Sequence, residues 1–124
     1  MKRRVFEDLK GQTLKSIQRV DDEKIIFTLL DGRKYELYHE NDCCETVTIE
    51  DVTGDLNDLV GVPLLQAEES TNTNDPKLVG EYQDVSFTWT FYKLATHKGY
   101  VTIRWYGSSN GYYSESVDFR EVPS

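Results

Sequence analysis

The sequence has few cysteines, few basic residues and no long apolar run. Its two cysteines are the adjacent Cys43 and Cys44, so it cannot contain the disulfide network that stabilises many small secreted domains. Fourteen Lys and Arg against 22 Asp and Glu give a net charge of -8, which disfavours nucleic-acid polymers because phosphate binding needs a basic face. No segment approaches the ~20 apolar residues of a transmembrane helix, and residues 1–8 lack the apolar stretch of a secretory signal. We therefore expect a cytoplasmic protein that binds neither nucleic-acid polymers nor membranes.

Hydrophobic residues are also scarce. They make up 38% of the 124 residues, below the ~45–50% of a typical globular domain. The length fits a single domain over residues 1–124, which would bury roughly two thirds of its unfolded surface. A core built from so few apolar side chains is either thin or completed by another subunit. We therefore expect a homodimer or a higher homo-oligomer.

The negative charge is concentrated in the middle of the chain. Residues 40–84 hold 12 acidic residues and 1 basic residue, a net charge of -11, whereas residues 1–39 carry +2 and residues 85–124 carry +1. An anionic small molecule would be repelled by the middle block and should bind near the first or last third. The acidic block itself is typical of a solvated surface that keeps a protein in solution.

Alternating sequence patterns predict a mainly β fold of the α+β class. Six segments have the β-branched and aromatic content of strands, namely residues 13–20, 24–30, 33–38, 86–92, 100–106 and 112–119. Asp31-Gly32 is typical of a two-residue type I′ hairpin turn. The last three segments form an antiparallel meander, in which Phe87, Trp89 and Phe91 share one face of their strand. We expect an antiparallel sheet meander.

One segment has helical rather than alternating spacing. Val52, Leu56, Leu59 and Val60 recur as on one face of a helix. Thr53 is placed to cap its beginning, and Gly61-Val62-Pro63 ends it. We therefore expect one short central helix within residues 51–60. Residues 70–80, rich in Asn, Asp, Pro and Gly, predict a loop.

Motifs for catalysis and for metal binding are weak. The sequence has no serine nucleophile elbow, no P-loop and no dinucleotide fingerprint. His39, Cys43, Cys44 and Glu45 suggest a zinc or thiol site, but structural zinc sites usually separate their cysteines by two to four residues. A simpler interpretation is that at least one of the cysteines packs in the interior as a small apolar side chain. We expect no catalytic residues, no metal and no cofactor, and keep a thiol- or metal-dependent hydrolase as a distant alternative.

The aromatic meander offers a better candidate site. Its Phe, Trp and Tyr side chains supply flat faces on which a nucleotide base could stack, and Arg104, in the middle of a strand, could bind a phosphate through two hydrogen bonds. Such a combination suits a small nucleotide better than a polymer. The alternative is that the aromatic stripe belongs to the core and that Arg104 pairs with a neighbouring carboxylate.

Four stretches of the sequence together resemble a known family. They are Asp42–Glu45 (DCCE), Gly54–Leu59 (GDLNDL), Thr88–Tyr92 (TWTFY) and Arg104–Ser114 (RWYGSSNGYYS). The last is long and unusual, and the resemblance covers roughly residues 35–120. It is to phage-encoded anti-Thoeris sponge proteins. The resemblance implies a homo-oligomer without enzymatic activity that sequesters cyclic ADP-ribose isomers made by bacterial TIR-domain defence enzymes, and in some members also cyclic trinucleotides.

The resemblance also implies roles for individual residues. Phe87 is similar to the stacking aromatic, His97 lies where a polar ligand contact is expected, and Arg104 with the turn at 110–114 would contact phosphate and ribose. Together with the aromatic residues of the meander, this assigns eight residues to ligand binding. They are Phe87, Phe91, His97, Arg104, Tyr106, Asn110, Tyr112 and Ser114.

The function expected from the sequence is therefore that of a phage anti-defence protein. It would bind and sequester a cyclic nucleotide immune signal, a cyclic ADP-ribose isomer or a cyclic oligonucleotide, in the cytoplasm of the infected host. The alternative is an acidic phage inhibitor or interaction module that binds a host protein through residues 40–84, where the charge is -11.

Overall fold

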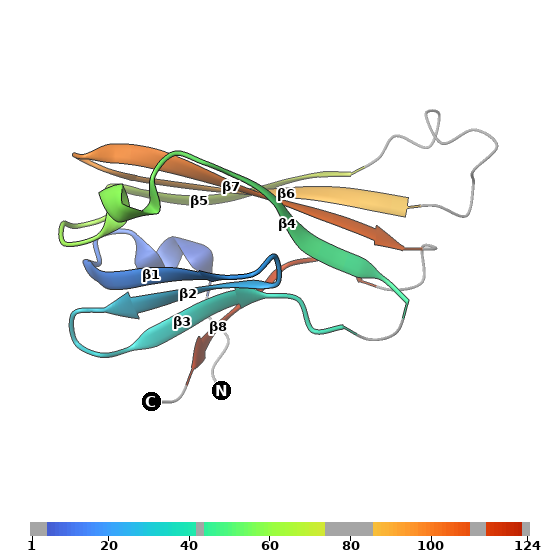
Figure 1. Ribbon diagram of the computed structural model, residues 1–124, viewed down its shortest axis with the longest axis horizontal. Helices are drawn as coiled ribbons and strands as arrows, with labels where there is room; N and C mark the ends of the chain where they lie inside the picture. Colours follow the sequence, from blue (N-terminus) through green and yellow to red (C-terminus); the bar gives the residue numbers. More distant parts are fainter. Residues whose placement is uncertain (1–4, 42–43, 74–85, 110–113, 123–124) are drawn as a thin grey trace.

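Two four-stranded antiparallel sheets pack face to face in the computed structural model, which describes residues 5–41, 44–73, 86–109 and 114–122 (Figure 1). One sheet has the order β1-β2-β3-β8 and the other the order β4-β7-β6-β5. The prediction of a mainly β, antiparallel fold is thus confirmed. No helix among the described residues is long and apolar enough to cross a membrane.

The first sheet is built from the N-terminal hairpins and the last strand. It contains β1 (Leu14–Val20), β2 (Lys24–Leu29), β3 (Lys34–Tyr38) and β8 (Asp118–Val122). A type I′ turn needs positive φ at both of its central residues. In this turn only Gly32 has positive φ, at 94°, and Leu29 N donates to Arg33 O at 2.8 Å. The turn is therefore a three-residue loop closed by a left-handed glycine, and the predicted two-residue type I′ turn is wrong.

The second sheet carries the first two strands of the aromatic meander. It contains β4 (Thr46–Thr53), β5 (Gln66–Thr73), β6 (Ser86–Thr96) and β7 (Gly99–Ser109). The β6–β7 hairpin turns at His97-Lys98, and its strands are longer than the sequence indicated. The strand predicted at 112–119 does not continue this meander, because residues 118–119 belong to β8, which pairs with β3 in the first sheet. β5 continues through residues 70–73, where a loop was predicted, because these residues pair with β6. Residues 74–80 of that predicted loop lie outside the described residues.

The predicted central helix is reduced to a single 3-10 turn. β4 extends to Thr53, and Val52 pairs with Ile103 of β7. Gly54 then adopts a φ of 103°, and η2 (Leu56–Leu59) begins after it. Asp55, not Thr53, caps η2 by accepting a hydrogen bond from Asn57 N at 2.9 Å. The helical spacing failed here because a left-handed glycine separates Val52 from the later apolar residues.

The core fills the space between the sheets. Its largest fully buried side chains include Trp105, Tyr92 and Phe27. A second 3-10 turn, η1 (Phe6–Leu9), inserts Phe6 between the layers, where its ring lies 4.7 Å from that of Tyr92 and 5.6 Å from that of Phe119. Through these ring contacts, η1 joins the two sheets.

Candidate functional site

The outer face of the second sheet brings aromatic and basic side chains together. Along β6 every second residue from Thr90 to Thr96 is buried, so the residues between them point away from the core. Antiparallel pairing places Phe91 opposite Arg104 and Trp89 opposite Tyr106. Four of the eight residues assigned from the sequence therefore lie on one face of the sheet, and Trp89 lies on the same face. We call these five residues the aromatic platform: Phe87, Trp89, Phe91, Arg104 and Tyr106.

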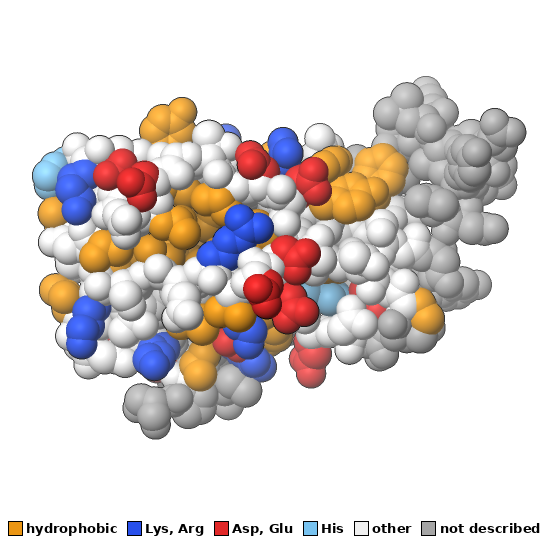
Figure 2. Space-filling model, viewed as in Figure 1, with side chains coloured by type: hydrophobic (Ala, Val, Ile, Leu, Met, Phe, Trp, Pro, Cys, Tyr) orange, Lys and Arg blue, Asp and Glu red, His pale blue; other side chains and the backbone are white. Residues whose placement is uncertain are grey.

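The rings of the aromatic platform lie against one another. The Phe87 and Tyr106 rings are stacked with centroids 6.1 Å apart, and the Trp89 and Tyr106 rings are tilted with centroids 4.6 Å apart. All three are partly exposed. Figure 2 shows hydrophobic side chains gathered over the beginning of β6, next to acidic side chains. The stripe of Phe87, Trp89 and Phe91 is thus only partly buried, whereas the alternating stripe of β7 that contains Trp105 lies in the core. The alternative is therefore wrong for the first stripe, but its pairing of Arg104 with a carboxylate is found, at Glu50.

Arg104 lies at the edge of these rings with much of its guanidinium available. Its Cζ is 5.2 Å from the centroid of the Trp89 ring, which is within the range of a cation–π interaction. Its Nη2 is 4.0 Å from Glu50 Oε1, and both side chains are 40% or more exposed. Such exposed pairs contribute only about 0–1 kcal/mol. Arg104 Nε is buried and has no hydrogen-bond partner among the described residues. An anionic ligand would therefore bind the exposed part of the guanidinium, where it would compete with Glu50.

The remaining predicted residues do not join the aromatic platform. His97 lies in the β6–β7 turn, six positions beyond Phe91, and at ~3.3 Å per strand residue it is roughly 20 Å away. Ser114 lies on the other side of the sheet, beside Ser116. Asn110 and Tyr112 lie outside the described residues. Within one chain, the structure therefore brings neither His97 nor Ser114 to the rings.

Two residues at or beside the aromatic platform, Trp89 and Glu50, were not among the eight residues assigned from the sequence. Trp89 alternates with Phe87 and Phe91, so the same pattern could have assigned it. Glu50 reaches Arg104 because β4 has an irregularity in register between Ile49 and Asp51, and no local sequence signal marks that irregularity.

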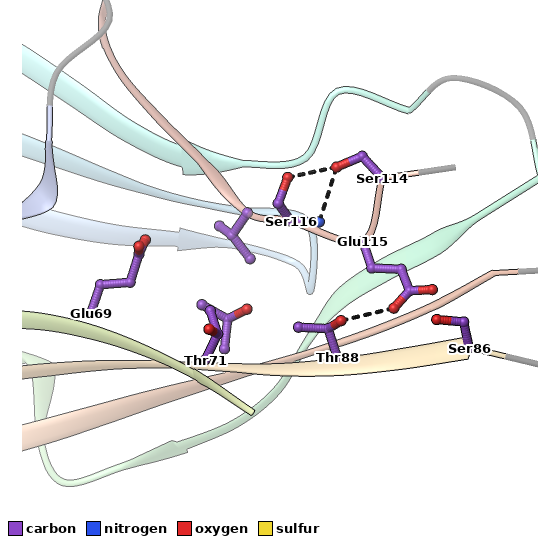
Figure 3. Close-up of a pocket in the computed structure, with 9 residues that line it drawn as sticks. Glu69, Thr71, Ser86, Thr88, Ser114, Glu115 and Ser116 are labelled. Atoms are coloured by element: carbon purple, nitrogen blue, oxygen red, sulfur yellow. Dashed lines mark hydrogen bonds between the residues drawn. The ribbon is translucent and has the colours of Figure 1, made fainter. Parts of the chain in front are cut away.

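A pocket of about 350 Å³ lies on the opposite, inner side of the same sheet. It is bounded by β5, β6 and the segment before β8, and we call it the inter-sheet pocket (Figure 3). Hydroxyl and carboxyl side chains line most of it, and the lining residues are Glu69, Thr71, Ser86, Thr88, Thr90, Ser114, Glu115, Ser116 and Val117. Glu115 is 9% exposed. Its two carboxylate oxygens accept hydrogen bonds from Thr88 Oγ1 at 2.8 Å and from Ser109 Oγ at 2.5 Å.

His39 is buried at the junction of the two sheets. Its Nδ1 lies 2.8 Å from the Ser116 carbonyl oxygen and its Nε2 lies 2.8 Å from Glu45 Oε2. Because a carbonyl oxygen only accepts, Nδ1 donates, and both ring nitrogens are used. These two contacts hold His39 in a structural role and leave neither ring nitrogen for a metal.

Cys44 is disulfide-bonded, so the expectation of a small packed thiol does not hold for it. Cys43 lies outside the described residues.

Within the described ranges, no three His, Cys, Asp or Glu side chains converge as metal ligands.

A family model described as a domain of unknown function, DUF7448, matches residues 7–119. No curated protein and no solved structure matches the sequence.

Proposed function

The chain belongs to the DUF7448 family, whose description gives no function, and we propose that it is a non-enzymatic protein that binds and sequesters a small cyclic nucleotide on the aromatic platform. The observation that carries this proposal is the juxtaposition of three partly exposed rings with the Arg104 guanidinium. The rings offer faces for a base, and the guanidinium offers hydrogen-bond donors for a phosphate.

The energetics of the platform fit a ligand of this size. Stacking of a base on an aromatic side chain contributes roughly 1–3 kcal/mol per base, and a guanidinium binds phosphate through two parallel hydrogen bonds. One arginine is too little for a polymer with many phosphates, which needs an extended basic surface. The net charge of -8 also disfavours a polymer.

The resemblance of the sequence to anti-Thoeris sponges narrows the proposed ligand. We assign it to the cyclic ADP-ribose isomers and, in second place, to cyclic oligonucleotides, encountered in the cytoplasm of a phage-infected cell. The platform is a sheet face rather than a deep cavity. A second copy of the chain would cover it and would make the ligand less accessible to solvent, so the proposal includes a homodimer or higher oligomer.

A thermal-shift panel tests the proposal. Cyclic ADP-ribose isomers and cyclic di- and trinucleotides are added to the full chain, with linear ADP-ribose and inorganic phosphate as controls. A ligand present at 100 times its Kd adds about 2.7 kcal/mol to the free energy of unfolding. A response to phosphate alone, or to none of the compounds, would contradict the proposal.

Analysis of the released ligand tests the absence of catalysis. After incubation and heat denaturation, chromatography should return the cyclic compound intact. A linear product would favour the hydrolase instead.

A second candidate, an acidic module that binds a host protein, rests on the charge of -11 over residues 40–84. It predicts no response to any nucleotide and a salt-sensitive complex with a basic protein.

A further inference from the structure

We propose that the inter-sheet pocket is a second binding site, for a small organic cation that carries two ammonium groups, such as a short aliphatic diamine. The site is independent of the aromatic platform, because the two lie on opposite faces of β6. Its chemistry is also opposite, since carboxylates rather than a guanidinium supply the charge.

Glu115 carries a buried charge that the described lining of the pocket does not compensate. It is 9% exposed, and the neutral hydroxyls of Thr88 and Ser109 donate hydrogen bonds to its carboxylate. No Lys, Arg or His is among the described residues that line the pocket. Buried carboxylates in proteins are normally paired with a cation or bound to a metal. A cationic ligand would supply the missing charge.

The pocket lining offers mainly hydrogen-bond acceptors that suit an ammonium group. The inner face of β5 and β6 changes from apolar residues such as Ala67 and Leu94 to the hydroxyl residues Thr71, Thr90 and Thr88 along the strands. An ammonium group donates three hydrogen bonds and accepts none, which matches carboxylates and hydroxyl oxygens. A phosphate would be repelled by both carboxylates.

The two carboxylates lie apart from each other. Figure 3 shows Glu69 at one end of the group of lining residues and Glu115 toward the other end, with Thr71 and Thr88 between them. Two separated negative groups fit a ligand with two separated positive groups better than one metal ion, which needs its ligands around a single centre. The volume of about 350 Å³ lies at the small end of ligand sites.

A glycine in β7 makes room for Glu115. Gly107 of β7 faces the core, and a Cβ at this position would lie 2.8 Å from the Glu115 carbonyl oxygen and 3.0 Å from its Cβ. The segment around Glu115 is further ordered by the hydroxyls of Ser114 and Ser116, whose oxygens are 2.6 Å apart. The carboxylate is therefore held at the pocket rather than displaced into solvent.

Calorimetry on the full chain tests the site. The probes are 1,4-diaminobutane, the neutral 1,4-butanediol of the same chain length, and calcium chloride. We expect the diamine to bind and the diol not to bind. Glu115→Gln keeps an oxygen acceptor but removes the charge, and it should weaken diamine binding at least tenfold.

Two further variants keep the test decisive. Glu69→Gln changes an exposed residue at the other end of the pocket. Because exposed ion pairs contribute less than buried ones, it should weaken diamine binding by about threefold to fivefold, and it tests the site even if Glu115→Gln fails to fold. Glu68→Gln is the matched control, because it changes the net charge equally on the same exposed strand but does not line the pocket; it should leave the Kd within twofold.

Several results would overturn the proposal. They are equal affinity for diol and diamine, higher affinity for calcium than for diamine, or an equal loss of diamine affinity in Glu68→Gln and Glu69→Gln. The test does not depend on nucleotide binding, so the proposed function and this inference succeed or fail separately.

Discussion

At the scale of single residues, Arg104 is the side chain on which ligand binding should depend most. Arg104→Ala should lower the affinity for a phosphate-bearing cyclic nucleotide by about 2–5 kcal/mol, because it removes a hydrogen-bonded charged partner. The fold should remain, since the side chain is 40% exposed and pairs only loosely with Glu50. Calorimetry measures the affinity and circular dichroism the fold.

Lys15→Ala provides the control for this prediction. It changes the net charge equally, but Lys15 is exposed on β1 in the other sheet. If Arg104→Ala and Lys15→Ala bind equally well, Arg104 does not contact the phosphate.

Tyr92 should make stability fall at alkaline pH. Burial, and next the neighbouring Glu69 carboxylate, raise the pKa of Tyr92 well above its ordinary value of 10.0. The folded state thus favours the neutral phenol. Its contribution to stability is complete below pH 10 and is lost as the pH rises from there toward the folded-state pKa. Urea unfolding between pH 9 and pH 11 should show a smaller loss of unfolding free energy in Tyr92→Phe than in the wild type.

Tyr100→Phe serves as the reference variant here, because Tyr100 is 68% exposed. Its stability should depend on pH as that of the wild type does. Parallel pH profiles for Tyr92→Phe and the wild type would show that Tyr92 does not contribute.

Some of these residue positions follow from sequence and others do not. Alternation correctly indicates that Phe87, Trp89 and Phe91 share a face, since the side-chain period of a strand is 2. It does not indicate which face is buried, because Tyr92 and Trp105 on the core side are equally aromatic. The contact of Glu115 with Thr88 joins residues 27 positions apart, and no local pattern encodes it.

At the scale of secondary-structure elements, β7 and the segment before β8 depend on each other through Gly107. Gly107→Ala should destabilise the protein by about 1–3 kcal/mol, because an added methyl group in a packed interior forces its neighbours to move. The atoms it would meet belong mainly to Glu115. Chemical denaturation measures the loss of stability.

Gly32→Ala is a useful comparison for this change. A Cβ at Gly32 meets nothing within 4 Å, although its φ is 94°, so its cost is one of backbone conformation alone. Only Gly107→Ala should also alter diamine binding in the inter-sheet pocket. Unchanged stability in Gly107→Ala would mean that the 114–117 segment moves without cost.

The local elements were the most predictable part of the fold. The hairpin β2–β3 and the hairpin β6–β7 have short connections, and alternation with turn residues indicates both. The central helix was mispredicted because Val52 has helical spacing from Leu56 but belongs to β4. Pairing with β7 decides the conformation at Val52, and pairing partners distant in sequence are not visible in a local window.

At the scale of the whole molecule, the outer aromatic platform predicts self-association. Exposed apolar patches beyond a few hundred Å² usually mark an interface, and closed dimers are the commonest homo-oligomers. Light scattering at micromolar concentration should therefore report at least twice the chain mass of 14.4 kDa. A monomer mass with full nucleotide binding would contradict the proposal that a second copy of the chain covers the aromatic platform.

Trp89→Ser should shift any dimer toward monomer. Leu65→Ser is the control, because Leu65 is 59% exposed and is not part of the aromatic platform, and it should leave the dimer unchanged.

The position of β8 has a consequence for the order in which the protein can fold during synthesis. β8 pairs with β3, and Arg120 Nε donates to Glu36 Oε1 at 2.6 Å across 84 residues of sequence. The first sheet therefore stays incomplete until residues 118–122 have left the ribosome. Until then the side of β3 that β8 will occupy is an open edge, ready to pair with a strand of another nascent chain. A ribosome that stalls before residue 118 leaves a product whose first sheet cannot close, and such truncated chains should aggregate.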